Sequence, residues 1–211
     1  MNRFAGVSLL AAFALLAACS HTVVVPVPPR VDLSSYNTIG IVAFDSNYDP
    51  ATSARATRAF QEQIQSAQPG TRFIELGERQ ALLASLGARQ LDAPALKKIG
   101  QRYGVAAVFL GDIAYSEPRV DVKISDIARM EGGVRAELRG DLSARLLETA
   151  SGASVWSSSS WARRQLGAVS VSEQGISGGM KNANPREEML PALIFEVTHD
   201  FRPTSMRQPA P

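Results

Sequence analysis

The side chain best suited to covalent chemistry is the thiol of Cys19, the only cysteine among 211 residues. It lies in the run Leu16-Ala17-Ala18-Cys19-Ser20, after an uncharged apolar stretch over residues 4–18 and a positively charged start at Arg3. A charged start, a short apolar core and small residues before a cleavage site are typical of an export signal. The apolar stretch is shorter than the roughly 20 residues that a membrane-spanning helix needs. We therefore expect cleavage before Cys19; the alternative is an uncleaved anchor with an incidental cysteine.

The five residues around Cys19 resemble the lipobox of bacterial lipoproteins. This resemblance implies a diacylglyceryl group on the Cys19 thiol and a further acyl chain on the new amino terminus. Because one acyl chain binds a membrane only marginally, two or more are needed for stable anchoring. The bacterial sorting rule retains mainly proteins with Asp after the cysteine at the inner membrane. Ser20 therefore favours the periplasmic face of the outer membrane.

Other nucleophiles and bases lack the partners that catalysis requires. The hydroxyls of Ser157 to Ser160 have no base close by in the sequence, so a polar strand face or turn is expected there. His199 is adjacent to Asp200, and a His–Asp pair can orient a general base. Adjacent residues of the predicted last helix point to different faces, however. We therefore predict no enzyme activity and no catalytic residue.

Four carboxylates follow the ends of predicted strands, where the ligands of parallel sheets gather. Carboxylates at such positions more often cap helices and form turns. We therefore predict neither a metal site nor a cofactor site. The four residues are Asp45, Asp49, Asp112 and Glu117.

Two further motifs favour structural roles. The glycine-rich run Gly175 to Lys181 lacks the Gly-Lys-Ser/Thr ending of a phosphate-binding loop. Trp156 and Trp161 can stack on a glycan or a partner, but on a half-buried strand tryptophan is more often part of the core.

The charge balance argues against nucleic-acid binding. Removing residues 1–18 deletes Arg3 from the 22 basic residues, which leaves 21 basic and 20 acidic side chains and a net charge of +1. Nucleic-acid-binding proteins cluster Lys and Arg on one face, and the sequence contains no such cluster. With Cys19 lipidated, no thiol remains for a disulfide or a thiolate catalyst. We infer no small-molecule substrate.

Composition divides the chain into four parts. Residues 1–18 are the predicted signal peptide, and residues 19–35 are a lipidated, proline-rich tether that favours an extended polyproline arm. Val23 to Val27 could alternatively form an edge strand. Residues 36–203 form the predicted periplasmic α/β domain, within which residues 167–184 are expected to be a flexible loop because they are rich in Gly, Ser and Asn. Residues 204–211 are expected to be a disordered tail.

The first half of the domain alternates strands and helices. Residues 37–44 and 105–110 are apolar runs typical of buried strands, and residues 72–76 are a further predicted strand between them. Asp49-Pro50 and Asp92 with Pro94 mark helix starts, and Gly104 marks a helix end. This order predicts a parallel sheet with crossover helices.

The second half predicts an antiparallel hairpin. From Val134 to Leu146 apolar and polar side chains alternate fully, which indicates a long strand with one wet face. Residues 149–152 are a predicted turn, 153–162 the returning strand, and Asn184-Pro185 opens a last helix in which Pro191 forms a kink or the true start. The predicted fold is a single α/β domain with a mixed sheet of about five to six strands, parallel in its first half, helices packed on it, and a carboxy-terminal helix.

Several runs occur in the order seen in a group of envelope proteins. Residues 39–44, residues 73–75 with Glu78-Arg79, and residues 98–113 resemble the periplasmic domain of the curli secretion channel lipoprotein CsgG. They are similar also to the penicillin-binding-protein activator LpoB and the amino-terminal domain of TolB. The segment 146–156 fits the hairpins of this group. The resemblance covers roughly residues 36 to 165 and implies an outer-membrane lipoprotein with a small mixed-sheet domain that works by protein contact.

Three functional hypotheses follow. The first is a non-enzymatic outer-membrane lipoprotein, attached through Cys19, that binds or scaffolds envelope proteins in assembly, secretion or peptidoglycan-related work. The second is an oligomeric secretion-channel subunit resembling the curli pore, which requires self-association. The third is an envelope hydrolase, for which His199 or Asp112 would have to carry the activity.

Overall fold

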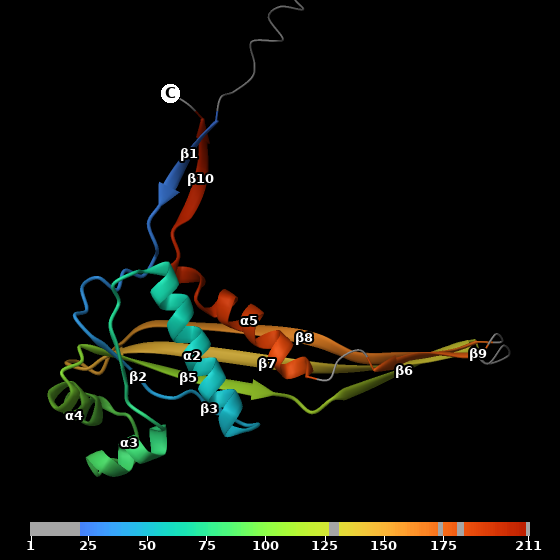
Figure 1. Cartoon of the computed structure of the whole chain (residues 1–211), viewed down its shortest axis with the longest axis horizontal. Helices are drawn as coiled ribbons and strands as arrows, with labels where there is room; N and C mark the ends of the chain where they lie inside the picture. Colours follow the sequence, from blue (N-terminus) through green and yellow to red (C-terminus); the bar gives the residue numbers. More distant parts are fainter. Residues whose placement is uncertain (1–21, 127–130, 173–174, 181–183, 210–211) are drawn as a thin grey trace, which may run out of the picture. The chain divides into compact units, whose positions relative to one another are not determined.

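The computed structural model describes residues 22–126, 131–172, 175–180 and 184–209. They form two compact units: an α/β unit, Arg30–Arg202, and a small unit made from the two ends of the chain. The α/β unit contains an eight-stranded mixed sheet in the order β4-β2-β5-β7-β8-β9, with β3 beside β5 and β6 beside β7 (Figure 1). The predicted α/β class with a mixed sheet is confirmed, although the sheet has more strands than the five to six expected.

The first half of the unit has the predicted parallel arrangement. Strand β2 pairs in parallel with β4 on one side and β5 on the other, and β3 continues the parallel pairing with β5. The elements are β2 (Ile39–Ile41), β3 (Asp45–Ser46), α2 (Pro50–Ala67), β4 (Phe73–Glu75), α3 (Arg79–Leu86), α4 (Ala93–Tyr103) and β5 (Ala107–Tyr115).

The helix boundaries follow the capping residues. Asp49 accepts a hydrogen bond from the Thr52 backbone N–H at the start of α2, and this hydrogen bond lowers the pKa of the Asp49 carboxyl. Asp92 accepts one from the Ala95 N–H at 3.0 Å at the start of α4. Gly104 ends α4 with a φ of 67°, the left-handed conformation that favours glycine. All three ends lie where the sequence predicts them.

The second half is wholly antiparallel. It contains β6 (Arg119–Asp126), β7 (Glu131–Glu148), β8 (Ser154–Ser172), β9 (Gly175–Met180), α5 (Pro185–Val197) and the 3-10 turn η1 (His199–Phe201). The turn at residues 149–152 is confirmed, with Gly152 at a φ of 76°. Pro191 lies inside α5 rather than at its start.

The flexible loop expected over residues 167–184 is wrong for most of its length. Residues 167–172 continue β8, and residues 175–180 form β9 in register with them. The glycines that indicated a loop have another role here: Gly178 has a φ of 124°, and a Cβ at this position would collide with the Ala168 carbonyl. Residues 173–174 and 181–183 lie outside the described residues.

The sheet is covered on both faces where β2, β5 and β7 lie side by side. Odd-numbered residues of β5, such as Phe109, face a core shared with α2 and α5, and even-numbered residues such as Val108 face α3 and α4. The Phe109 ring has four aromatic neighbours, with centroid distances of 5.1 Å to Phe60, 6.0 Å to Phe73, 5.9 Å to Trp156 and 5.7 Å to Phe201.

The α/β unit begins before residue 36, so the predicted tether over 19–35 is too long. Leu33 is fully buried in the core. Gln68 holds this segment at the end of α2: its side chain accepts a hydrogen bond from the Leu33 N–H at 2.8 Å and donates one to the Val31 carbonyl at 2.6 Å. One buried leucine in a proline-rich run gives too weak a sequence signal to mark this boundary.

The small unit is a two-stranded antiparallel ladder. Strand β1 (Thr22–Val27) pairs with β10 (Thr204–Pro209), with Thr22 opposite Pro209 and Val27 opposite Thr204. Val23 to Val27 therefore form a strand, as the alternative prediction states, and not a polyproline arm. The tail expected to be disordered over residues 204–211 is strand at residues 204–209. The valines of β1 suit an extended backbone, and the partner strand supplies the hydrogen bonds that a polyproline arm lacks.

Candidate interaction surface

The outer part of the antiparallel sheet continues past the segment covered by helices. We call this part the strand extension: β6, residues 131–137 of β7, residues 165–172 of β8, and β9 (Figure 1). Strand β7 is the continuous element, because its residues 140–148 pair with β5 and its residues 131–137 pair with β6. A single 18-residue strand thus joins the core to the strand extension.

One face of the strand extension is apolar and open to solvent. The ladders place Val122, Val134 and Val169 in one row across β6, β7 and β8, with Val120 and Ile124 on either side of Val122. Val122 is 65% exposed and Ile124 71%, while Val134 and Val169 are each 39% exposed. Exposed apolar side chains that lie singly are ordinary, but a contiguous group on one face marks an interaction site. We call these five residues the valine face.

The valine face is the uncovered continuation of the core face. Even-numbered residues of β7 lie on one side of the sheet, so Val134 and Ala136 share a side with buried Leu138 and Leu142. Helix α5 packs on this side of β7 and β8 but does not cover the extension. The opposite side carries charged residues, among them Arg119, Asp121, Lys123 and Arg135. The strand extension is therefore amphipathic.

A polar network fixes the base of the strand extension. The Asn47 side chain donates to the Tyr115 carbonyl and accepts from the Tyr115 N–H, both at 2.9 Å. The Tyr115 hydroxyl donates to the Arg186 carbonyl at 3.2 Å, which joins the end of β5 to the start of α5. The Arg186 guanidinium lies 4.0 Å from the centroid of the Tyr48 ring. Burial raises the pKa of Tyr115 to about 12.

Replacing Tyr115 with phenylalanine should alter the stability of the protein at alkaline pH. The Tyr115 pKa of about 12 is above the ordinary value of 10.0, so the folded state keeps a proton that the unfolded state loses. This contribution is fully present below pH 10 and is lost as the pH rises toward 12. We expect the wild type to be more stable than Tyr115→Phe by about 1 kcal/mol at pH 8. Urea unfolding at pH 8, 10 and 11.5 should show this difference shrinking, and a constant difference would contradict the assignment.

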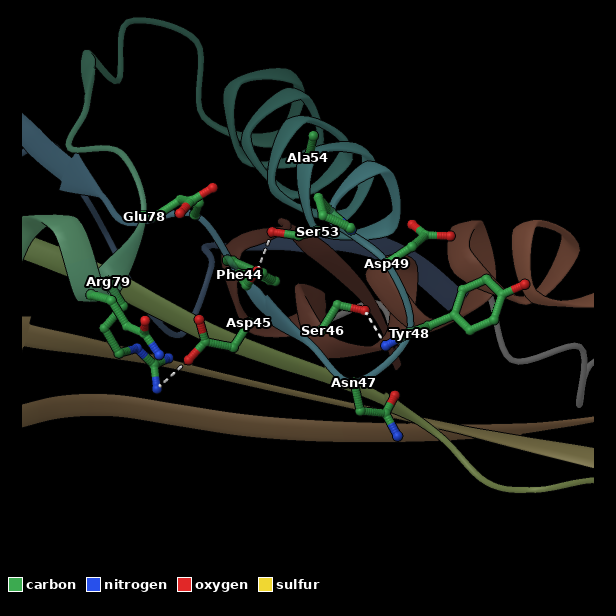
Figure 2. A pocket seen from close by; sticks show the side chains of 13 residues that line it. Phe44, Asp45, Ser46, Asn47, Tyr48, Asp49, Ser53, Ala54, Glu78 and Arg79 are labelled. Carbon is green, nitrogen blue, oxygen red and sulfur yellow. Dashed lines mark hydrogen bonds and ion pairs between the residues drawn. The ribbon is translucent and has the colours of Figure 1, made fainter.

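Three of the four predicted strand-end carboxylates have structural partners. Asp45 and Asp112 lie directly opposite each other on β3 and β5. Their like charges would repel, but Arg79 bridges them, at 2.8 Å to Asp45 Oδ2 and 3.1 Å to Asp112 Oδ1. Figure 2 shows the Arg79 side chain reaching Asp45 beside the loop that leads to α2. Asp49 caps α2, while Glu117 lies in the turn between β5 and β6.

A pocket of about 440 Å³ adjoins the ion pair between Arg79 and Asp45. It is lined by residues 43–50 and by the starts of α2 and α3, including Tyr48, Ser53 and Glu78 (Figure 2). Within the described ranges, no group of three or more His, Cys, Asp or Glu side chains is arranged to hold a metal ion. Among the described residues, no helix is long and apolar enough to cross a membrane.

The remaining candidate residues are placed as follows. Cys19 lies outside the described residues. His199 lies in η1 rather than on the last helix, with its Nδ1 3.9 Å from Asp200 Oδ1. Asp200 accepts hydrogen bonds from Trp156 Nε1 at 3.1 Å and Arg30 Nη1 at 3.3 Å, so it ties the end of the unit to β8. Within the run Ser157 to Ser160, Ser160 donates to the Leu193 carbonyl at 2.8 Å.

The two tryptophans have different environments. Trp156 is buried against Phe109 and Phe201, as the core interpretation predicts. Trp161 is 60% exposed on the opposite face of the sheet. Successive side chains of a strand point to opposite faces, so two residues at an odd spacing lie on different faces. The spacing of Trp156 and Trp161 could therefore have predicted their different environments.

The valine face was not predicted as a functional surface, although the alternation over residues 134–146 includes Val134. Alternation shows which side chains share a face, but whether a helix covers that face depends on where α5 begins.

Comparisons with known proteins show likeness of fold alone. No protein-family model and no curated protein matches the chain. Among solved structures, the PelC dodecamer from Paraburkholderia phytofirmans is 15% identical, with 86% of this chain and 98% of that chain covered and a TM-score of 0.42. A putative neuraminyllactose-binding hemagglutinin homolog from Helicobacter pylori is 14% identical, with 77% and 81% covered and a TM-score of 0.46. The LpoB C-terminal domain from Salmonella enterica is 12% identical, with 71% and 90% covered and a TM-score of 0.35. LpoB is thus one of the proteins that the sequence resembles and is also a structural neighbour, at low identity.

Proposed function

We propose that this chain is a lipid-anchored periplasmic protein of the bacterial outer membrane that binds proteins of the cell envelope, and that the valine face is its contact surface. The observation that carries the proposal is the solvent exposure of these five contiguous apolar side chains on one face of the sheet. The lipobox around Cys19 supports the location. No catalytic role is proposed for any residue.

The chemistry of the valine face suits a protein partner. Val and Ile lose little side-chain entropy when buried, because their branched side chains already occupy few rotamers. Covering a half-exposed Val or Ile contributes about 1 kcal/mol, so the five residues together supply about 5 kcal/mol toward association. Charged residues on the reverse side, such as Lys123 and Arg135, keep the other face of the strand extension in water.

Placing a charge on the valine face should abolish binding and leave the fold intact. In Val122→Asp, a carboxylate enters the valine face between Val120 and Ile124, beside Val134 on the next strand. We expect the yield of envelope proteins that copurify after crosslinking in cells to fall at least tenfold, because burying an unpaired charge is costly. The melting temperature should change little, since Val122 is 65% exposed in the folded protein.

The matched control is Lys123→Asp, one residue along β6 on the opposite face. This variant should retain the crosslinked partners. Equal partner recovery from Val122→Asp and the wild type would refute the role of the valine face. If the crosslinked species were only multiples of this chain, the second hypothesis, an oligomeric subunit, would replace binding of a foreign protein.

A further inference from the structure

A second surface lies on the other side of the sheet, along the outer edge of β8. Strand β9 pairs with β8 only at residues 167–172. From Trp156 to Leu166, the structure describes no strand on the outer edge of β8, and no backbone hydrogen bond between described residues leaves that edge. Helix α5 packs on one face of β8, where Ser160 and Arg164 contact it, so Trp161 and Arg163 project from the opposite face.

Trp161 lies between two arginines on this open face. The Arg139 and Arg163 guanidinium carbons are 5.4 Å and 5.3 Å from the centroid of the Trp161 ring. Arg139 and Arg163 are directly opposite each other across the β7–β8 ladder, an arrangement in which like charges repel. Trp and Arg are also the residue types enriched at the energetic centres of protein interfaces.

The cluster of Arg139, Trp161 and Arg163 carries a positive charge that the described residues do not fully balance. Arg139 is neutralised by Asp141, whose carboxylate accepts from its Nε at 2.9 Å. Arg163 forms no ion pair with any described residue, and neither does Arg145, which lies farther along the same face. An anionic group placed beside Arg163 would neutralise the guanidinium that Asp141 leaves unbalanced. The cluster is therefore complementary to a carboxylate.

We propose that the open edge of β8 accepts an extended acidic segment of a partner protein, which adds as a further strand along residues 156–166. Backbone hydrogen bonds to the free edge would supply affinity, as in other cases of strand addition. Side chains of an added strand lie about 5 Å from their cross-strand neighbours. The segment would thus set a carboxylate against Arg163 and an apolar side chain against Trp161. This surface is separate from the valine face and does not depend on the function proposed above.

The test measures binding of labelled nine-residue peptides to the full lipidated chain in nanodiscs. The first, the Glu–Val peptide, is Glu-Thr-Val-Thr-Glu-Thr-Val-Thr-Glu, which as a strand places Glu and Val in turn on one face. The second has Lys in place of each Glu, and the third is the Glu–Val peptide with two central prolines, which cannot add as a strand. We expect only the first to bind. Its binding should protect amides of residues 156–166 from hydrogen exchange.

Variants assign the binding to this edge. Arg163→Glu and Trp161→Ala should each weaken binding of the Glu–Val peptide about tenfold, as expected for interface hot spots. Arg58→Glu, the same charge reversal on an exposed position of α2, should change it less than twofold, and so should Val122→Asp. Unchanged circular dichroism would show that the variants fold.

Three outcomes would overturn the proposal. The first is equal binding of the proline-containing peptide, or of dextran sulfate with no amide protection, which would indicate a general polyanion site. The second is binding that survives Arg163→Glu. The third is concentration-dependent dimerisation of the chain that Trp161→Ala abolishes, which would assign this edge to a second copy.

Discussion

Replacing Phe109 with alanine should lower the free energy of unfolding by about 3–5 kcal/mol, the range for removing a fully buried phenylalanine. Phe109 is completely buried at the centre of the sheet, and its ring contacts aromatic rings from α2, β4, β8 and η1. The substitution therefore leaves a cavity bordered by rigid side chains that cannot collapse to fill it. Urea unfolding followed by circular dichroism measures the loss directly.

The matched control for Phe109 is Phe195→Ala. Phe195 is 51% exposed on α5, where the Arg202 guanidinium lies 3.4 Å from its ring centroid. Because the ring is half in water, this variant should lose less than about 1 kcal/mol. Similar losses for the two variants would contradict the placement of the core around Phe109.

Replacing Cys19 with serine should move the protein from the membrane fraction to the soluble fraction of the cell envelope. A serine hydroxyl cannot take the thioether-linked diacylglyceryl group that the lipobox resemblance implies, and anchoring depends on these acyl chains. We expect nearly all of the wild type and almost none of Cys19→Ser to sediment with membranes after a carbonate wash.

Ser20→Ala is the control for Cys19→Ser, because it preserves the thiol and the small residue that follows it. It should sediment with membranes as the wild type does. Mass spectrometry of the amino-terminal peptide should find acyl groups on Cys19 in both proteins that keep the thiol. A Cys19→Ser variant that stays on the membrane would contradict lipid anchoring.

The parts of the fold that local sequence determines were predictable. Asp49, Asp92 and Gly104 act through hydrogen bonds or dihedral angles within three or four residues, so their effect is visible in the sequence itself. The alternation from Val134 to Leu146 likewise shows which side chains share a face before any partner strand is known. These signals predicted the parallel first half, the β7–β8 turn and the buried side of β7.

The parts that depend on distant partners were not predictable. Residues 22–27 and 204–209 come from opposite ends of the chain, and neither segment indicates that the other will pair with it. Residues 167–172 have the composition of a loop, and they become strand because β7 continues beside them and supplies a hydrogen-bonding edge. The interaction surfaces depend on the same distant effects: the start of α5 limits the cover beside the valine face, and the short pairing of β9 leaves the edge of β8 open at residues 156–166.

The most direct measurement is photo-crosslinking in living cells from single positions on β6. p-Benzoylphenylalanine at position 122 samples the valine face, and the same group at position 123 samples the charged face of the same strand. If the valine face is a contact surface for envelope proteins, position 122 should yield a discrete crosslinked envelope protein and position 123 should not. Equal crosslinking from both positions, or none from position 122 in membrane-anchored protein, would contradict it.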